Sequence, residues 1–273
     1  MKNKFISRQS NRLLSHFHAL DQPCVDMAAA YKAMPGSKPA AVRELLRDMT
    51  SRGLLMRLKE GLYYIIPYEE DPDVFMPDWH LIAGCLAGGS EYYVGFYSAL
   101  HLHNLITQPS LKEQIVVSRQ IRPSEIRIRD VPFQFICLNR QHFFGSTGIW
   151  VDNFNKVSCS DLEKTIIDCL FKPDYAGGIV EVSRAIHAAE DRLHFGKMLE
   201  YAIRFGSQAV IKRLGFLLET LGIQTGITGE LRRLKTDSYI PLDTELPRKG
   251  RRLRRWGILQ NLDTDTITSA IYT

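Results

Sequence analysis

Residues 37–67 constrain the fold of this chain more than any other part of the sequence. From 39 to 52, apolar side chains recur at helical spacing, which gives the expected helix one core face made by Val42, Leu45, Leu46 and Met49. Gly53 then ends the helix, and short apolar runs at 54–58 and 62–66 flank Lys59-Glu60-Gly61. This order predicts a helix followed by a β-hairpin, in which Gly61 supplies the positive φ of the turn.

Two shorter helices are expected before this segment. Apolar residues at helical spacing between 13 and 20 predict the first, and Asp26 is placed to cap the second. Pro35-Gly36 predicts a turn, and Ser37 is the expected N-cap of the amphipathic helix that follows. Helix, short helix, turn, amphipathic helix and hairpin is the order of a winged helix-turn-helix, which we predict for residues 1–67.

The outward face of the amphipathic helix carries Arg43 and Arg47, which helical spacing places side by side. An α-helix fits the major groove of DNA, where one Arg bound to guanine discriminates by about 1–3 kcal/mol. The helix start and the hairpin tip are suited to the neighbouring phosphates. The residues predicted to contact DNA from this domain are Ser37, Lys38, Arg43, Arg47, Arg52, Arg57 and Lys59.

Excess positive charge is confined to two places. Residues 1–67 hold eleven Lys/Arg against five Asp/Glu, a net charge of +6, whereas the remainder has a net charge of −1. Such confinement favours a phosphate-bearing partner, although a solvated face or a protein contact stays open for this domain. Inside the remainder, a cluster without acids is a second candidate for DNA phosphates, for RNA, for an acidic partner or for solvent alone: Arg248, Lys249, Arg251, Arg252, Arg254 and Arg255.

The acidic, proline-bearing run Glu69-Glu70-Asp71-Pro72-Asp73 predicts a linker over residues 68–77 and a second domain over 78–273. That domain is expected to have a strand-rich middle and a helical later part, so the fold class is α+β. Helices are expected at 78–86, 92–104, 161–171, 178–190, 195–205 and 209–221, and strands at 114–118, 126–129, 132–138, 149–151 and 156–158.

Six short segments follow one another over nearly the whole chain: residues 61–64 (GLYY), 93–100 (YVGFYSAL), 163–168 (EKTIID), 213–219 (RLGFLLE), 239–243 (YIPLD) and 255–258 (RWGI). In this order they resemble the AbiEi-type antitoxins of abortive-infection, or type IV, toxin–antitoxin systems. The resemblance implies a winged helix that binds inverted repeats in its own promoter and represses its operon. It also implies a C-terminal antitoxin domain that counteracts a nucleotidyltransferase-like toxin without a stable complex.

The chain carries no run near the ~18 apolar residues of a membrane span, and no apolar stretch of a secretory signal follows its basic N-terminus. Its cysteines are odd in number, widely spaced and free of C-x-x-C pairs. We therefore expect reduced thiols in the cytoplasm and no membrane partner. The cysteines are Cys24, Cys85, Cys137, Cys159 and Cys169.

Motifs of nucleotide and metal sites are not found in the sequence. Neither a G-x-x-x-x-G-K-[ST] loop nor a strand-linked G-x-G-x-x-G occurs, and no paired carboxylates follow Gly88-Gly89-Ser90 as nucleotidyltransferase chemistry requires. His101 and His103 point to different faces of an expected helix, so with Cys85 they do not predict a metal site. We expect no metal and no cofactor.

One acidic segment is the remaining catalytic candidate, made by Asp161, Glu163, Lys164 and Asp168. We interpret it as the start of a helix, whose dipole favours acids, and predict no catalytic residue. Two further functions stay open. One is a transcription regulator that responds to a small ligand, and the other is a DNA-binding enzyme such as a nuclease, which would depend on Asp168 or Glu163.

Overall fold

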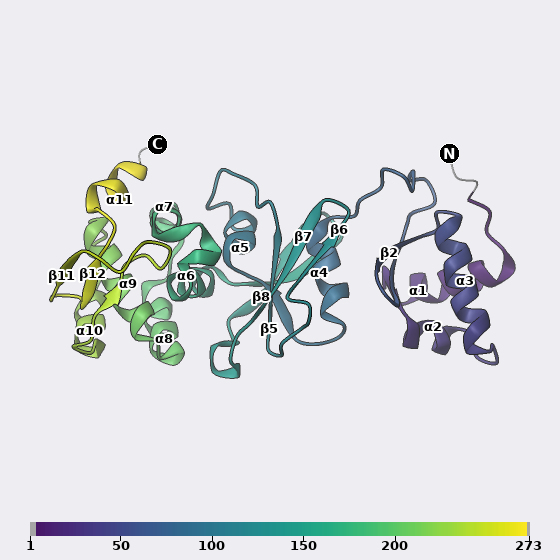
Figure 1. Ribbon diagram of the computed structural model, residues 1–273, viewed down its shortest axis with the longest axis horizontal. Coiled ribbons are helices and arrows are strands. Elements are labelled where there is room, and N and C mark those ends of the chain that lie inside the picture. Colours follow the sequence, from purple (N-terminus) through teal and green to yellow (C-terminus); the bar gives the residue numbers. More distant parts are fainter. Residues whose placement is uncertain (1–3, 272–273) are drawn as a thin grey trace. The chain divides into compact units, whose positions relative to one another are not determined.

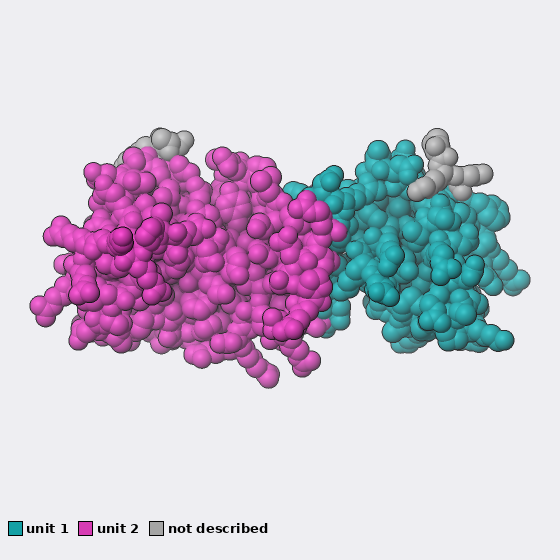
Figure 2. Space-filling view, in the orientation of Figure 1, with its two compact units in different colours: residues 1–89, 128–130 teal, residues 90–127, 131–273 magenta. Residues whose placement is uncertain are grey.

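The computed structural model describes residues 4–271, and the chain forms two compact units (Figures 1 and 2). Unit 1 comprises residues 1–89 with 128–130, and unit 2 comprises residues 90–127 with 131–273. Helices and sheets occur in both units, so the predicted α+β fold class is confirmed at that level.

Unit 1 combines helices with a three-stranded antiparallel sheet in the order β1-β3-β2. Its elements are α1 (Arg8–Ala19), β1 (Cys24–Asp26), α2 (Met27–Ala33), α3 (Pro39–Ser51), β2 (Leu55–Lys59), β3 (Leu62–Ile65) and α4 (Trp79–Ala87). The helices and the hairpin lie where the sequence predicts them. Strand β1 was not expected, because three residues are too short for an alternating pattern to show.

The core of unit 1 explains why its helices form. Leu13 and Phe17 of α1 pack with Leu46 and Met49 of α3, and all four are at most 1% exposed. Burying each such side chain contributes about 1.5–3 kcal/mol relative to leaving it exposed. The start of α2 is fixed as predicted, since the Asp26 carboxylate accepts a hydrogen bond from the third residue of the helix at 2.7 Å.

Helix α4 belongs to unit 1, although the sequence placed it at the start of the second domain. A disulfide joins its Cys85 to Cys24 of β1, with a Cα–Cα distance of 5.9 Å. The segment before α4 is also held, because the Arg129 guanidinium donates to the carbonyls of Pro72 and Asp73. The expectation that all cysteines are reduced is therefore wrong for this pair, whose proximity arises only from the packing of distant elements.

Unit 2 contains a six-stranded mixed sheet in the order β6-β7-β5-β4-β9-β8 and a small sheet in the order β10-β12-β11. The strands are β4 (Tyr92–Val94), β5 (Glu113–Val117), β6 (Glu125–Ile128), β7 (Val131–Cys137), β8 (Ser146–Trp150), β9 (Lys156–Ser160), β10 (Ile240–Pro241), β11 (Arg251–Leu253) and β12 (Ile258–Gln260). The α-helices are α5 (Phe96–Leu102), α6 (Leu162–Phe171), α7 (Gly178–Ala188), α8 (Phe195–Phe205), α9 (Gln208–Thr220), α10 (Ile227–Leu234) and α11 (Thr264–Ala270).

The helix expected over 92–104 is wrong over its first four residues. Strand β4 occupies Tyr92–Val94 and pairs with β5 and β9, and α5 begins only after Gly95. A Cβ at Gly95 would lie 2.6 Å from Val116, so the strand-to-helix turn requires glycine. A short buried run is apolar on every side whether it forms a strand or a helix. Its sequence therefore has no periodicity that could distinguish the two.

The helical part of unit 2 packs on the sheet through one continuous apolar core. Trp256, 2% exposed, precedes β12 and lies against α9, where a Cβ at Gly215 would lie 2.1 Å from the indole ring. The glycine in mid-helix therefore allows this close approach. Among residues 4–271, no helix combines the length and the hydropathy needed to cross a bilayer.

Candidate nucleic-acid interface

Helix α3 presents one charged and one apolar face, as its sequence predicts. Val42, Leu45, Leu46 and Met49 are at most 7% exposed, whereas Arg43 and Arg47 are exposed on the other side. Pro39 occupies the first turn, where its missing N–H costs no hydrogen bond. The N-cap is Lys38 rather than the predicted Ser37, and no side chain caps the helix, so Ser37 has lost the local role expected for it.

The hairpin β2–β3 carries the second group of cations. Gly61 has φ +70°, and a β-bulge lies between Arg57 and Lys59, so the turn has the geometry that its sequence predicts. The side chains of Arg57 and Lys59 are exposed. Strand β2 thus places Arg57 on the solvent side while the alternate residues Met56 and Leu58 face the core.

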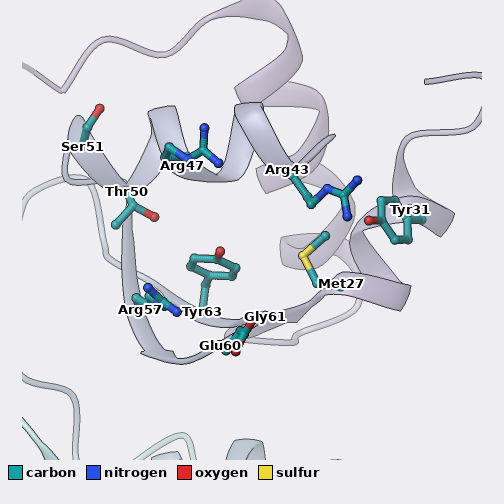
Figure 3. A pocket seen from close by; sticks show the side chains of 10 residues that line it. All are labelled: Met27, Tyr31, Arg43, Arg47, Thr50, Ser51, Arg57, Glu60, Gly61 and Tyr63. Atoms are coloured by element: carbon teal, nitrogen blue, oxygen red, sulfur yellow. The ribbon is translucent and has the colours of Figure 1, made fainter. Parts of the chain in front are cut away.

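A pocket of about 600 Å³ lies between α3 and the hairpin (Figure 3). Arg43 and Arg47 reach it from the helix and Arg57 from β2. The ring of Tyr63 projects from β3 into the opening between α3 and the hairpin (Figure 3). Arg43 extends toward Tyr31 of α2 (Figure 3). The remaining lining residues are Met27, Thr50, Ser51, Glu60 and Gly61.

The tyrosines of this pocket were not found by sequence reasoning. Tyr31 and Tyr63 sit in apolar segments and read as core residues, but each is half-exposed and presents a hydroxyl-bearing ring to the arginines. Only the pairing of β1 with β3 brings α2 and the hairpin to the same opening. No pattern within either segment carries that information.

The pocket is positively charged. Arg47 meets Glu44 one turn earlier only at 3.9 Å, and both side chains are more than three-quarters exposed, so the pair is weak. Within residues 4–271, neither Arg43 nor Arg57 forms an ion pair. Glu60 is the acid among the lining residues. Three arginines around one opening therefore leave a net positive field that attracts polyanions.

Two predicted DNA contacts are used differently. The guanidinium of Arg52 binds the Asp48 carboxylate at 2.5 Å and the Ser10 hydroxyl at 2.8 Å, and it also donates to the Phe5 carbonyl. With its side chain 16% exposed, Arg52 joins α3 to the N-terminal segment and has no donor directed at a ligand. The Lys59 ammonium donates to the Leu86 carbonyl of α4 at 3.4 Å, so its reach toward a phosphate is limited.

The predicted cluster of unit 2 is also divided by the fold. Arg255 forms two 2.7 Å hydrogen bonds to Glu219, which raise its pKa, and Glu219 also accepts from the Trp256 indole. Arg255 thereby supports the Trp256 anchor through Glu219, which accepts from two of its donors. Arg252 stacks over Tyr239 at 5.5 Å. The other members are exposed on or beside β11: Arg248, Lys249, Arg251 and Arg254.

The acidic segment of unit 2 forms two separate networks. Lys164 and Asp168 are fully buried as an ion pair, and the Tyr93 hydroxyl donates to Asp168 while it accepts from Lys164, both at 2.9 Å. Burial raises the pKa of Asp168 and lowers that of Lys164. The attraction between the two charges opposes both shifts. Asp168 has no exposed edge with which to reach a substrate.

The second network involves the start of α6. Asp161 caps the helix through the Lys164 amide at 2.9 Å, as the structural interpretation predicts. Glu163, by contrast, accepts from the Lys197 ammonium at 2.8 Å and from the His194 amide at 3.0 Å. The acids that a nuclease would use, Asp168 and Glu163, are therefore engaged in ion pairs and hydrogen bonds within unit 2.

The histidine candidates do not converge on a metal site. His103 contacts the Ser160 carbonyl at 2.8 Å through its Nε2 atom, and Cys85 is bonded to Cys24. In the part of the chain that the structure describes, no group of three or more His, Cys, Asp or Glu side chains is arranged to hold a metal ion.

Comparison with known proteins gives a fold relationship. A solved structure of the Rv2827c protein from Mycobacterium tuberculosis is similar, with a TM-score of 0.67 over 100% of this chain and 97% of that one. The two sequences are 14% identical, so the likeness shows a shared fold alone. No protein-family model matches the chain. No curated protein matches it either.

Proposed function

We propose that unit 1 is a winged helix-turn-helix that binds duplex DNA. The observation that carries the proposal is the pocket where Arg43 and Arg47 of α3 face Arg57 of the hairpin. A helix and a basic hairpin on either side of one opening suit the two surfaces of a duplex, its major groove and the adjoining sugar–phosphate strand.

The residues have different tasks in this proposal. Arg43 and Arg47, which project from consecutive turns of α3, enter the major groove and form bidentate hydrogen bonds with guanine. Arg57 and Lys38 contact phosphates on either side. Tyr63, on the floor of the pocket, adds a hydroxyl donor for the strand that crosses it. Ser37 is adjacent to Lys38 and half-buried. Its backbone N–H donates to the Met34 carbonyl at 3.2 Å, so we assign its supporting role to the side-chain hydroxyl.

We further propose that the chain acts in the cytoplasm as an antitoxin and autorepressor. Support comes from the resemblance of its ordered segments to AbiEi-type antitoxins. Unit 1 binds inverted repeats in the promoter of its own operon, and unit 2 counteracts a nucleotidyltransferase-like toxin encoded beside it. The exposed cations Arg248, Lys249, Arg251, Arg252 and Arg254 of unit 2 give further phosphate contacts.

A gel-shift titration tests the DNA-binding proposal. The purified chain is titrated into its own upstream DNA and into a scrambled duplex of the same length. We expect tighter binding to the upstream DNA and a loss of that preference in Arg47→Ala. Arg12→Ala, which removes an exposed arginine of α1 outside the pocket, is the matched control and leaves binding unchanged. Equal retardation of both duplexes, with no effect of Arg47→Ala, contradicts sequence-specific recognition.

Growth experiments test the antitoxin proposal independently. The reading frame beside this one is induced with and without the chain, and growth is recorded. We expect rescue by the wild type and by Arg47→Ala, because neutralisation is assigned to unit 2. Growth arrest in both cultures, or no arrest without the chain, contradicts the antitoxin role and leaves DNA binding to be judged by the gel shift.

The basic cluster of unit 2 is tested by the salt dependence of affinity. Each lost phosphate contact reduces the slope of log K against log salt by about 0.9. We expect the double variant Arg251→Ala/Arg254→Ala to reduce that slope by about 1.8, which corresponds to two lost contacts. Arg255→Ala leaves the slope unchanged because Arg255 is held by Glu219. An unchanged slope in the double variant removes the cluster from the interface.

A further inference from the structure

The cysteines of this chain fall into two chemically different groups. Cys24 and Cys85 are half-buried and bonded to each other, so small thiols and disulfides have access to them. Cys159 and Cys169 are fully buried, and burial raises the pKa of both thiols, which keeps them unreactive. Cys137 is exposed and has no partner cysteine within the described residues. The bonded pair alone combines access with a partner.

The bond lies beside the candidate interface. Cys24 begins β1 and pairs in register with Tyr64 of β3, the second strand of the hairpin. Cys85 lies in the last turn of α4, and its neighbour Leu86 accepts the hydrogen bond from Lys59 at the hairpin tip. The disulfide therefore holds the C-terminal end of α4 against the sheet. The Leu86 carbonyl at that end accepts a hydrogen bond from the Lys59 ammonium.

We propose that Cys24 and Cys85 form a reversible thiol–disulfide switch that reacts with low-molecular-weight disulfides and controls the access of Lys59 to DNA. This inference rests on the proposed DNA-binding function. A chain that works beside DNA in the cytoplasm meets a pool of small thiols, in which a half-exposed disulfide forms only under oxidation. The oxidised form holds α4 in place and withholds Lys59, and the reduced form releases both.

The reaction proceeds by two thiol–disulfide exchanges. One cysteine thiolate attacks a small disulfide RSSR, forms a mixed disulfide with the chain and expels RS⁻. The second cysteine thiolate attacks the chain sulfur of that mixed disulfide, which forms the Cys24–Cys85 bond and expels a second RS⁻. The two cysteines lose two electrons and two protons in total, and one RSSR becomes two RSH. Excess RSH reverses both steps.

Reduction has a measurable electrostatic consequence. Without the bond, α4 is tied at this point only by non-covalent contacts, which include a long hydrogen bond of 3.4 Å from Lys59. A duplex phosphate is a stronger partner for an ammonium than a neutral carbonyl. One added phosphate contact makes the salt slope steeper by about 0.9 and raises affinity about 5–10-fold at roughly 0.1 M salt.

The first experiment follows the bond itself without DNA. The full chain is equilibrated with glutathione disulfide or with dithiothreitol, alkylated and digested, and amide hydrogen exchange is recorded for α4. We expect alkylation of Cys24 and Cys85 only after reduction, together with faster exchange in α4. Alkylation of both in the oxidised sample, or identical exchange in the two states, overturns the inference even if DNA binding is intact.

The second experiment measures DNA binding against salt for both redox forms. We expect the reduced chain and Cys85→Ser to bind a duplex about 5–10-fold more tightly than the oxidised chain at roughly 0.1 M salt. Cys137→Ser is the matched control and keeps the redox difference. Lys59→Ala is expected to abolish it, since no ammonium is left to release. A redox difference that persists in Lys59→Ala, or weaker binding after reduction, overturns the inference.

The two experiments separate this inference from the proposed function. If neither redox form binds DNA while hydrogen exchange in α4 is still faster after reduction, the proposed function fails. The claim that the disulfide holds α4 in place then stands. If both forms bind the upstream DNA with the same salt slope, the proposed function stands and the switch fails.

Discussion

Arg43, Arg47 and Arg57 of unit 1 extend into solvent around one pocket, whereas Arg213 and Lys164 of unit 2 are buried. Arg213 is 2% exposed and donates to the carbonyls of Leu242, Leu170 and Pro241 at 2.7–3.0 Å. Burial lowers its pKa to about 10, which still leaves it charged at neutral pH. Lys164 is equally hidden beside Asp168. Arg43, Arg47 and Arg57, in contrast, have weak partners or none among the described residues.

This difference separates stability from recognition. A buried cation surrounded by oxygen atoms connects elements of the fold, and its loss leaves a neighbouring charge or carbonyl unsatisfied. An exposed cation contributes little to stability but sets the electrostatic potential that a phosphate meets. Substitutions of buried and of exposed cations should therefore affect different measurements, and the following predictions test that separation in order of decreasing effect.

The largest effect is expected for Lys164→Ala. The substitution leaves the buried Asp168 without its cation and lowers the free energy of unfolding by about 3–5 kcal/mol. Chemical denaturation monitored by circular dichroism measures the loss. Lys164→Met/Asp168→Asn, which removes both charges and keeps an acceptor for Tyr93, should recover most of it. A loss below about 1 kcal/mol in Lys164→Ala would show that the pair is dispensable and would break the comparison.

For Arg47→Ala we expect a smaller effect, which falls on DNA affinity and not on stability. The variant should lose about 1–3 kcal/mol of affinity for its preferred DNA, because one guanine contact is removed. Its stability should change by less than about 0.5 kcal/mol, since the Arg47 side chain is 77% exposed. Fluorescence anisotropy and thermal denaturation on the same sample measure both quantities. A stability loss comparable with that of Lys164→Ala would contradict the division between exposed and buried cations.

Arg52→Ala sharpens the comparison within a single helix. Arg52 lies one residue after α3 yet is bound to Asp48, Ser10 and the Phe5 carbonyl. We expect a loss of about 1–2 kcal/mol in stability, typical of hydrogen bonds to a charged group, and little change in the salt slope of DNA binding. If Arg52→Ala instead reduces that slope by a full contact, the guanidinium leaves its internal partners when DNA is present.

The smallest expected effect concerns acid stability at Glu219. The hydrogen bond from Arg255, with that from Trp256, lowers the pKa of Glu219 in the folded chain below the ordinary 4.5. Its contribution is therefore complete above that value and is lost as pH falls through the lowered folded-state pKa. Melting temperatures of the wild type and Glu219→Gln should differ near neutral pH and converge in acid. A constant difference from neutral pH to about pH 3 would contradict this origin.

Local patterns predicted much of unit 1 and of the strand-rich region. The periodicity of residues 39–52 placed Arg43 and Arg47 on an exposed face, and Gly61 marked the hairpin turn. The same reasoning failed over 92–104, where a short apolar run is buried in either conformation, and it missed the small sheet around β12. Strands of two or three residues carry too few side chains for an alternation to be read.

The sequence by itself determined which residues form the charged face of α3 and where the hairpin turns, because helical spacing and glycine conformation act within a few residues. Only the tertiary structure decided that Arg52 binds Ser10, that Arg255 binds Glu219, that Tyr63 shares a pocket with the arginines, and that Cys24 meets Cys85. The Arg52–Ser10, Arg255–Glu219 and Cys24–Cys85 contacts join residues 42, 36 and 61 positions apart. No spacing rule reaches that far, since such neighbours are set by how whole elements pack.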